Sequence, residues 1–251
     1  MPATLEVLFA PAEFEALSGR DLSDSVCVVF DIFRATSTIV TALANGADAV
    51  VPVAEISDAL ALRRQYPDVL LAGEREGLRI RRELTGSIDF DLGNSPREFT
   101  RDRVGGKTIV LTTTNGSRAL RACAHAKEVL VASFLNLTAT AGYLRQHPAP
   151  NLLLVCSGTG SQTAYEDLLG AGALADLIWG QFKDNATDSA KAARELYKIE
   201  EKQLLTAAGT SRNGRRLLSI ADLCEDVPWC LERDRFPLVA KLNGAAVIKL
   251  P

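Results

Sequence analysis

Polar residues that could bind an anion or a metal ion follow an uninterrupted apolar run. Residues 26–30 (VCVVF) are apolar without alternation, which predicts a strand covered on both faces. The run ends on Asp31, and Arg34 follows before residues 36–38 (TST) open a predicted helix that ends at an Asn-Gly pair. Ligands of open α/β sheets bind at this strand-to-helix edge. The sequence therefore places an acid and a guanidinium at a ligand-binding edge.

Two later turns repeat this pattern, one after the apolar residues 108–111 and one after residues 152–155. Each turn supplies glycine for close approach, hydroxyl donors and the N–H groups of a helix N-terminus, a combination that attracts anions. The candidate anion-binding residues are Thr113, Thr114, Asn115, Gly116, Ser157, Gly158, Thr159 and Gly160. Neither turn matches GxxxxGK[ST] or GxGxxG, so no nucleotide fingerprint is present. Helix capping is the alternative role for each single hydroxyl.

Arginines accompany these turns. Arg34, Arg75 and Arg118 each stand beside a predicted strand end or turn. A guanidinium next to anion-binding N–H groups favours recognition of phosphate, sulfonate or carboxylate through forked hydrogen bonds.

Carboxylates are the candidate metal ligands. Asp31 and Glu74 each follow an apolar run, and Asp167 stands early in the helix after residue 161. The chain has only two histidines, which leaves little for a zinc site or a histidine-based triad. Clustered carboxylates instead suit a hard cation such as Mg²⁺. The alternative is that these acids pair with neighbouring arginines.

Two known phosphatase mechanisms can be tested by spacing. A cysteine phosphatase needs Cys-x5-Arg at a strand-to-helix turn, but Gln162 stands six residues after Cys156, which excludes that mechanism. An aspartyl phosphatase of the haloacid dehalogenase type needs Asp-x-Asp. Asp31 supplies the first acid but Phe33 replaces the second, which weakens this mechanism without excluding it.

Apolar runs alternate with helical patterns along the chain, which predicts right-handed crossovers and a three-layer α/β/α fold with a mostly parallel, or mixed, sheet. Strands are expected at residues 5–8, 26–30, 49–53, 69–72, 108–111, 128–132 and 152–155. Residues 78–95 are predicted to form a loop rich in arginine. Residues 184–221 are predicted to form a helical cap or packing segment of a single domain spanning 1–251, and residues 245–248 a late strand at a sheet edge.

Composition narrows the function classes. Hydrophobic residues make up 47% and charged residues 24%, and the net charge is −3, so no basic field points to nucleic acid or an anionic membrane. No apolar run approaches the ~20 residues of a membrane span, and no signal peptide is recognisable. Five cysteines without metal spacing favour reduced thiols and a cytoplasmic location. We expect a homodimer, with the 184–221 helices packing internally or pairing two subunits.

The sequence from about residue 26 to residue 174 resembles the 2-phosphosulfolactate phosphatase family, and the C-terminal part does so more weakly. The resemblance lies in the blocks FDIFRATSTIVTAL, AGEREG, FDLGNSP, TTTNGSRAL and CSGTGSQTAYEDLLGAGAL. It implies an α/β/α fold and Mg²⁺-dependent hydrolysis of (2R)-2-phospho-3-sulfolactate to 3-sulfolactate and phosphate, a step towards coenzyme M. The basic stretch 79–87 departs from the family pattern, which has a shorter link and a glycine where Asp89 stands.

With this resemblance, our hypothesis is that Asp31, Glu74 and Asp167 hold Mg²⁺ directly or through water, while water or Asp31 itself attacks phosphorus. A small anionic phosphorylated substrate would be bound by the three arginines and the two turns, together with Ser37, Thr38, Asn94 and Ser95. Two alternatives stay open at this point. One is a phosphatase of the same fold acting on another phosphorylated 2-hydroxy acid. The other is a non-catalytic binder of an anionic metabolite.

Overall fold

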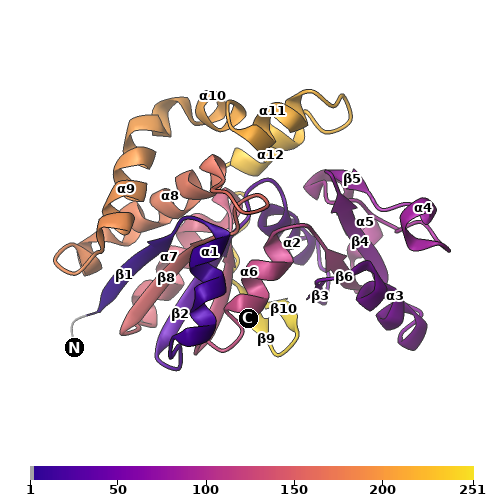
Figure 1. Ribbon diagram of the computed structural model, residues 1–251, viewed down its shortest axis with the longest axis horizontal. Coiled ribbons are helices and arrows are strands. Elements are labelled where there is room, and N and C mark those ends of the chain that lie inside the picture. The colour runs from indigo at the N-terminus through magenta and orange to yellow at the C-terminus, as the bar shows by residue number, and fades with distance from the viewer. Residues whose placement is uncertain (1–2) are drawn as a thin grey trace.

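The computed structural model describes residues 3–251 and has a mixed α/β architecture, with helices on both faces of one large, mostly parallel sheet (Figure 1). The predicted fold class is therefore confirmed. Within the described residues the strand order is β1-β8-β2-β7-β9-β10-β3-β6-β4-β5. The strands are β1 (Thr4–Leu8), β2 (Ser25–Phe30), β3 (Ala49–Val53), β4 (Leu70–Arg75), β5 (Leu78–Arg79), β6 (Thr108–Thr112), β7 (Glu128–Ala132), β8 (Asn151–Cys156), β9 (Ala240–Asn243) and β10 (Ala246–Lys249).

The last two strands form a hairpin in the middle of the sheet, between two parallel halves. β9 pairs antiparallel with β7, and β10 pairs antiparallel with β3. A two-residue loop that begins with Gly244, at φ +59°, closes the hairpin. The prediction of an edge strand at 245–248 was thus wrong. The sequence of a short apolar strand does not show whether the strand lies at the edge or at the centre of a sheet, because the position depends on pairing with segments distant in the chain.

The two halves present their strand ends to one shared region. Because the hairpin pairs antiparallel with both halves, the strands of one half run in the opposite sense to those of the other. Neighbouring strands are rotated by roughly 20–25°, so the five steps from β2 to β6 add up to a rotation of roughly 100°. This rotation turns the ends of the two halves towards each other. Contacts across the two halves show the convergence. The Gly160 N–H after β8 donates to Asn115 Oδ1 after β6 at 3.0 Å, and Arg34 after β2 donates to the Gly77 carbonyl after β4 at 2.6 Å.

Helices cover both faces of the sheet, and the side chains of β2 explain why its sequence does not alternate. Val28 and Phe30 pack in the core beneath α8, whereas Cys27 and Val29 pack in the opposite core beneath α2. The helices up to α8 are α1 (Pro11–Glu15), α2 (Ala35–Ala44), α3 (Ile56–Gln65), α4 (Arg82–Thr85), α5 (Arg101–Val104), α6 (Gly116–Ala122), α7 (Leu137–Gln146) and α8 (Tyr165–Phe182). Single 3-10 turns lie at Ala16–Gly19, Pro96–Glu98, Phe134–Asn136 and Glu201–Gln203. The stretch 78–95, predicted as loop, contains β5 and α4.

The C-terminal segment is helical, as predicted for 184–221. It contains α9 (Asp188–Glu200), α10 (Leu204–Gly209) and α11 (Arg212–Leu218), and α12 (Asp226–Leu231) follows. α9 packs along α8, while α10 to α12 lie over the strand ends at the top of Figure 1. This arrangement brings side chains from the last quarter of the chain to the site described below.

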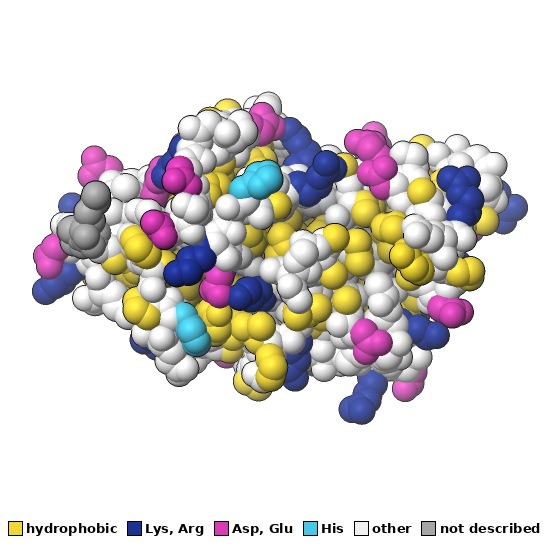
Figure 2. All heavy atoms as spheres, turned by 90° about the horizontal axis from the view of Figure 1, so that it is seen from below, with side chains coloured by type: hydrophobic (Ala, Val, Ile, Leu, Met, Phe, Trp, Pro, Cys, Tyr) yellow, Lys and Arg dark blue, Asp and Glu magenta, His cyan; other side chains and the backbone are white. Residues whose placement is uncertain are grey.

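Within residues 3–251, every helix is too short or too polar to cross a bilayer. On the face shown in Figure 2, basic and acidic side chains of the described residues are interspersed with apolar ones.

The α8–α9 contact depends on a glycine. A Cβ at Gly172 would lie 2.2 Å from the Ala193 carbonyl oxygen of α9, whereas a Cβ at Gly180 on the same helix would meet open space. We expect Gly172→Ala to lower the free energy of unfolding by about 2 kcal/mol through overpacking. Gly180→Ala should raise it by about 0.5–1 kcal/mol because alanine favours helix. Urea unfolding measures both, and equal shifts would contradict the packing argument.

Candidate active site

A cavity of about 380 Å³ opens where the ends of the two sheet halves meet. It is lined by many of the residues that the sequence singled out: Asp31, Arg34, Glu74, Arg75, Asn94, Thr113, Thr114, Asn115 and Thr159. These residues come from five separate turns of the chain, so the structure does bring the predicted polar positions together. The cavity contains both acidic and basic groups, which is the arrangement needed to hold a cation next to an anion.

Asp31 lies at the end of β2 and is almost fully buried. Its Oδ1 accepts the Ala35 N–H at 3.1 Å, in the first turn of α2. Burial, followed by the charges of Glu74 and Glu166, raises the pKa of Asp31 to about 7, although the N–H groups of Ala35 and Gly116 oppose the shift. Near neutral pH this carboxyl group is therefore poised between its protonated and ionised forms.

Glu74 is held by the backbone on both of its oxygens. Oε1 accepts the N–H and the hydroxyl of Thr114, each at 2.9 Å, and Oε2 accepts the Gly77 N–H at 2.7 Å. The carboxylate therefore links the end of β4 to the turn after β6 and fixes one wall of the cavity.

Three guanidiniums line the same cavity. Arg34 is buried and donates to Asp226 Oδ2 at 2.7 Å and to the Gly77 carbonyl at 2.6 Å. Arg75 donates to the Glu74 carbonyl at 2.7 Å and to Thr112 Oγ1 at 3.0 Å. No carboxylate within residues 3–251 forms an ion pair with Arg75 or Arg216. The positive charge of these two side chains is thus available to an anionic ligand.

Several predicted site residues lie outside the cavity. Arg118 forms an exposed ion pair with Glu15, because α6 buries Ser117, Ala119 and Leu120 and turns Arg118 to solvent. This corrects the expectation that Arg118 faces the anion site. Ser37 and Thr38 are buried in α2, where they donate to the carbonyls of Ile32 and Asn94 at 2.9 Å. Ser95 donates to Asp226 Oδ1 at 2.6 Å and lines a second cavity instead.

The turn at residues 157–160, after β8, is held in place by Asp167. Asp167 Oδ1 accepts the Ile32 N–H at 2.8 Å, and Oδ2 accepts the Gly158 N–H at 3.0 Å. Burial is the main cause that raises the pKa of Asp167 well above its ordinary value. Of this turn, Thr159 lines the cavity, while Ser157, Gly158 and Gly160 do not. Asp167 therefore clamps two strand-end turns to each other, and the structure does not bring it to the cavity wall with Asp31 and Glu74.

The sequence reasoning missed residues that arrive from the C-terminal helices. Asn213 and Arg216 of α11 line the cavity, and Asp226 of α12 pairs with Arg34. Asn213 Nδ2 donates to Thr159 Oγ1 at 2.7 Å and to Glu166 Oε1 at 2.6 Å, so its position is fixed. Amphipathic spacing showed that this region is helical but carried no signal for where α11 would dock.

Two buried polar atoms at the cavity have no partner. Asn94 Oδ1 is a free acceptor and Thr113 Oγ1 a free hydroxyl, and neither has a hydrogen bond within the described residues. No three His, Cys, Asp or Glu side chains gather into a metal-binding group in residues 3–251. Unpartnered buried polar groups are costly, so these two atoms mark positions where a bound group would contribute hydrogen bonds or coordination.

Comparison with known proteins gives the class of the molecule. A family model described as 2-phosphosulpholactate phosphatase matches residues 13–245. A protein of Caldanaerobacter subterraneus subsp. tengcongensis is 38% identical over 236 residues, covering 93% of this chain and 94% of the relative. Proteins of Thermotoga petrophila and Thermotoga maritima are 40% and 38% identical over 223 residues, covering 88% of this chain and 91% of each relative. All three are named probable 2-phosphosulfolactate phosphatase.

The chain is therefore an enzyme, a phosphoric monoester hydrolase with a mixed α/β fold, whose strand-end cavity combines acids with guanidiniums. Within that class, it belongs to the 2-phosphosulfolactate phosphatase family.

The closeness of Gly116 to Asp31 gives a test of the site. A Cβ at Gly116 would lie 2.8 Å from Asp31 Oδ2 and 2.7 Å from the Ala35 Cβ. We expect Gly116→Ala to lower phosphatase activity by at least about tenfold, since a displacement of about 1 Å can cost about a hundredfold. Steady-state phosphate release measures the loss. Gly142→Ala, where a Cβ meets open space, is the control and should keep wild-type activity.

Proposed function

We propose that the chain hydrolyses (2R)-2-phospho-3-sulfolactate to 3-sulfolactate and inorganic phosphate with the help of Mg²⁺. The observation that carries the proposal is the composition of one cavity. Asp31 and Glu74 line it together with Arg34, Arg75 and Arg216, two of which have no carboxylate partner among the described residues. A substrate with phosphate, sulfonate and carboxylate groups needs this number of cationic contacts. The names of the relatives support the same substrate.

The residues present fit a magnesium ion. Mg²⁺ is commonly held by one or two carboxylates together with water and substrate phosphate oxygens. Asp31 and Glu74 would supply the carboxylates, and the unpartnered Asn94 Oδ1 in the same cavity is a hard amide oxygen of the kind that such an ion accepts. Bound there, Mg²⁺ would neutralise charge on the phosphoryl oxygens.

The chain's own side chains have separate tasks in this reaction. Arg75 and Arg216 bind anionic groups of the substrate, and the free hydroxyl of Thr113 donates to one of its oxygens. Hydrolysis forms a bond from the attacking oxygen to phosphorus and breaks the bond from phosphorus to the C2 oxygen, which takes up a proton. The attacking oxygen belongs to water or to Asp31. If Asp31 attacks, water then attacks phosphorus of the phosphorylated carboxylate, which releases phosphate and restores Asp31. Acid quenching of a single turnover with ³²P-labelled substrate separates these routes, because only the covalent route leaves phosphate on Asp31.

The proposal extends to the cellular compartment and to the use of the product. The five cysteines are all unpaired, which supports a reducing cytoplasmic compartment. The product, 3-sulfolactate, would enter coenzyme M biosynthesis.

The decisive experiment is a substrate panel with purified enzyme. Phosphate release is measured from phosphosulfolactate, 2-phospholactate and phosphoglycerate, each with Mg²⁺ or with excess chelator. We expect turnover to be fastest with phosphosulfolactate and to disappear with chelator. Equal rates with chelator would refute the metal assignment, and a preference for phospholactate would move the substrate to another phosphorylated 2-hydroxy acid.

Magnesium affinity should depend on pH through Asp31. The pKa of this carboxyl group is raised to about 7, so below that value the metal must displace a proton. We expect the apparent dissociation constant for Mg²⁺ to rise by about tenfold for each pH unit below 7 and to level off above it. Titration calorimetry at pH 5.5, 6.5 and 8 measures this dependence. A dissociation constant that is flat across this range would show that Asp31 does not bind the ion.

A further inference from the structure

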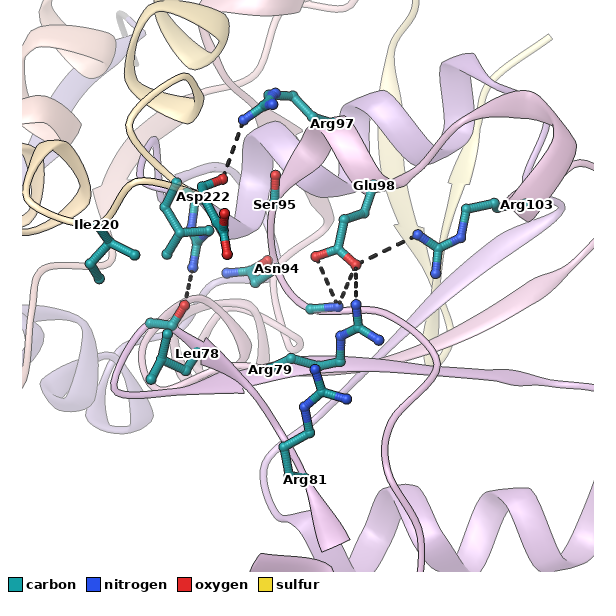
Figure 3. Close-up of a pocket in the computed structure, with 14 residues that line it drawn as sticks. Leu78, Arg79, Arg81, Asn94, Ser95, Arg97, Glu98, Arg103, Ile220 and Asp222 are labelled. Carbon is teal, nitrogen blue, oxygen red and sulfur yellow. Dashed lines mark hydrogen bonds and ion pairs between the residues drawn. The ribbon is translucent and has the colours of Figure 1, made fainter.

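A second cavity, of about 630 Å³, is shown in Figure 3. It adjoins the 380 Å³ cavity described above, which we call the catalytic cavity, and shares Arg34, Gly77 and Asn94 with it. Its remaining wall is rich in arginine: Arg79, Arg81, Arg97 and Arg103. Arg79 and Arg81 belong to the basic stretch 79–87, which the proposed reaction does not use. We refer to this space as the arginine cavity.

The ion pairs of the arginine cavity leave positive charge uncompensated. Arg79 and Arg103 share one carboxylate, Glu98, at 3.2 and 3.6 Å. Arg34 and Arg97 likewise share Asp226, at 2.7 and 3.6 Å. Each pair of guanidiniums therefore has a single partner and retains about one positive charge.

The remaining charges in the wall do not remove this excess. Arg81 pairs with Asp89 at 3.3 Å in an exposed contact. Asp222 also lines the cavity but is exposed, and Arg97 contacts its backbone carbonyl, at 3.4 Å, rather than its carboxylate. Exposed carboxylates are screened by water and interact weakly with neighbouring charges.

The two centres of excess charge lie apart. In Figure 3, Arg97 lies above Ser95 and Asn94, whereas Glu98 lies to the right of Asn94 with its partners Arg79 and Arg103. Guanidinium forks suit planar or tetrahedral oxyanions. Two separate cationic centres suit a ligand that carries two anionic groups.

The substrate does not need this space. Pockets of about 300–1,000 Å³ hold drug-sized ligands, so the 380 Å³ of the catalytic cavity already accommodates a three-carbon compound. We propose that the arginine cavity is a second ligand site that binds a small organic dianion with two separate carboxylate or sulfonate groups.

Binding of sulfoacetate, which carries one carboxylate and one sulfonate, tests this proposal with acetate as the monoanion control. Calorimetry with full-length enzyme in Mg²⁺ should give saturable binding of sulfoacetate and at least tenfold weaker binding of acetate. Arg103→Gln and Arg81→Gln should each weaken sulfoacetate binding, by about tenfold when combined. Both side chains are about half exposed, so the variants retain the fold.

The matched control is Arg216→Gln, because Arg216 lines only the catalytic cavity. Sulfoacetate affinity should be the same in this variant as in the wild type. A loss of affinity in Arg216→Gln would place the dianion in the catalytic cavity and overturn the proposal. The absence of sulfoacetate binding up to about 10 mM would also overturn the proposal. An unchanged affinity in the Arg81 and Arg103 variants would do the same. The readout is binding, so its outcome does not depend on the proposed reaction.

Discussion

Replacing Asp31 by asparagine is expected to abolish phosphate release and, at pH 8, to make the folded protein more stable. The loss of activity follows from the place of Asp31 in the cavity with Glu74 and three guanidiniums. Asparagine cannot act as an anionic metal ligand or as a nucleophile, so we expect kcat/KM to fall by at least about a thousandfold. The measurement is phosphate release at saturating Mg²⁺.

The gain in stability follows from the cost of ionising a buried carboxyl group. Burial raises the pKa of Asp31 from 3.8 to about 7. One pKa unit is about 1.4 kcal/mol, so the ionised group costs the fold up to roughly 4 kcal/mol. Between pH 4 and pH 7 the folded protein keeps a proton that the unfolded chain has released. The wild type therefore loses stability as pH rises through this window and stays level above it.

The Asp31→Asn variant has no such titration, so its melting temperature relative to wild type should rise from pH 5 to pH 8. Scanning calorimetry with chelator present measures the difference without a contribution from bound metal. Asp89→Asn is the control, because the Arg82 N–H lowers the pKa of Asp89 and ionised Asp89 stabilises the fold. Asp89 is ionised in the folded and unfolded states throughout this pH range, so the melting temperature of Asp89→Asn relative to wild type should be lower and constant from pH 5 to pH 8. A relative melting temperature of Asp31→Asn that falls with rising pH would contradict the burial argument.

Local features of the site could be read from the sequence because they depend on residues adjacent in the chain. The apolar run of β2, the acid at its end and the helix that follows are fixed by a stretch of about 20 residues. The same holds for the turn at 113–116. Parallel crossovers place such turns at one end of a parallel half of the sheet, which is why Glu74 and Thr113 lie together. Asp31 ends a strand of the other half, which runs in the opposite sense, and it reaches the same cavity because the sheet twists.

The remaining features are set by contacts between distant segments. The β9–β10 hairpin joins the two halves of the sheet through partners more than 100 residues away. Asp226 reaches Arg34 across 192 positions, and α11 brings Arg216 to the cavity. Asp167 was predicted to face a metal, but its position on α8 points both oxygens at backbone N–H groups. No local pattern distinguishes these outcomes, because each is decided by how helices dock on the finished sheet.

The buried ion pair between Arg34 and Asp226 should be one of the most costly contacts to break. The two side chains are 3% and 0% exposed, and Asp226 also accepts the Ser95 hydroxyl. Removing Asp226 leaves the almost fully buried guanidinium of Arg34 without its carboxylate partner, which costs about 3–5 kcal/mol. We expect Asp226→Asn to lower the free energy of unfolding by this amount in urea. Glu6→Gln, which breaks the exposed pair with Arg20, should cost at most about 1 kcal/mol.

A double variant separates the structural role of this pair from its role in the reaction. Apolar residues of similar volume often replace a buried ion pair at little cost, so Arg34→Met combined with Asp226→Leu should recover most of the stability that Asp226→Asn loses. Activity should stay low, because Arg34 lines the candidate active-site cavity and also donates to the Gly77 carbonyl in its wall. The thermodynamic cycle through the single variants gives the coupling energy. A stable double variant with wild-type kcat/KM would mean that Arg34 acts only as a structural link between β2 and α12.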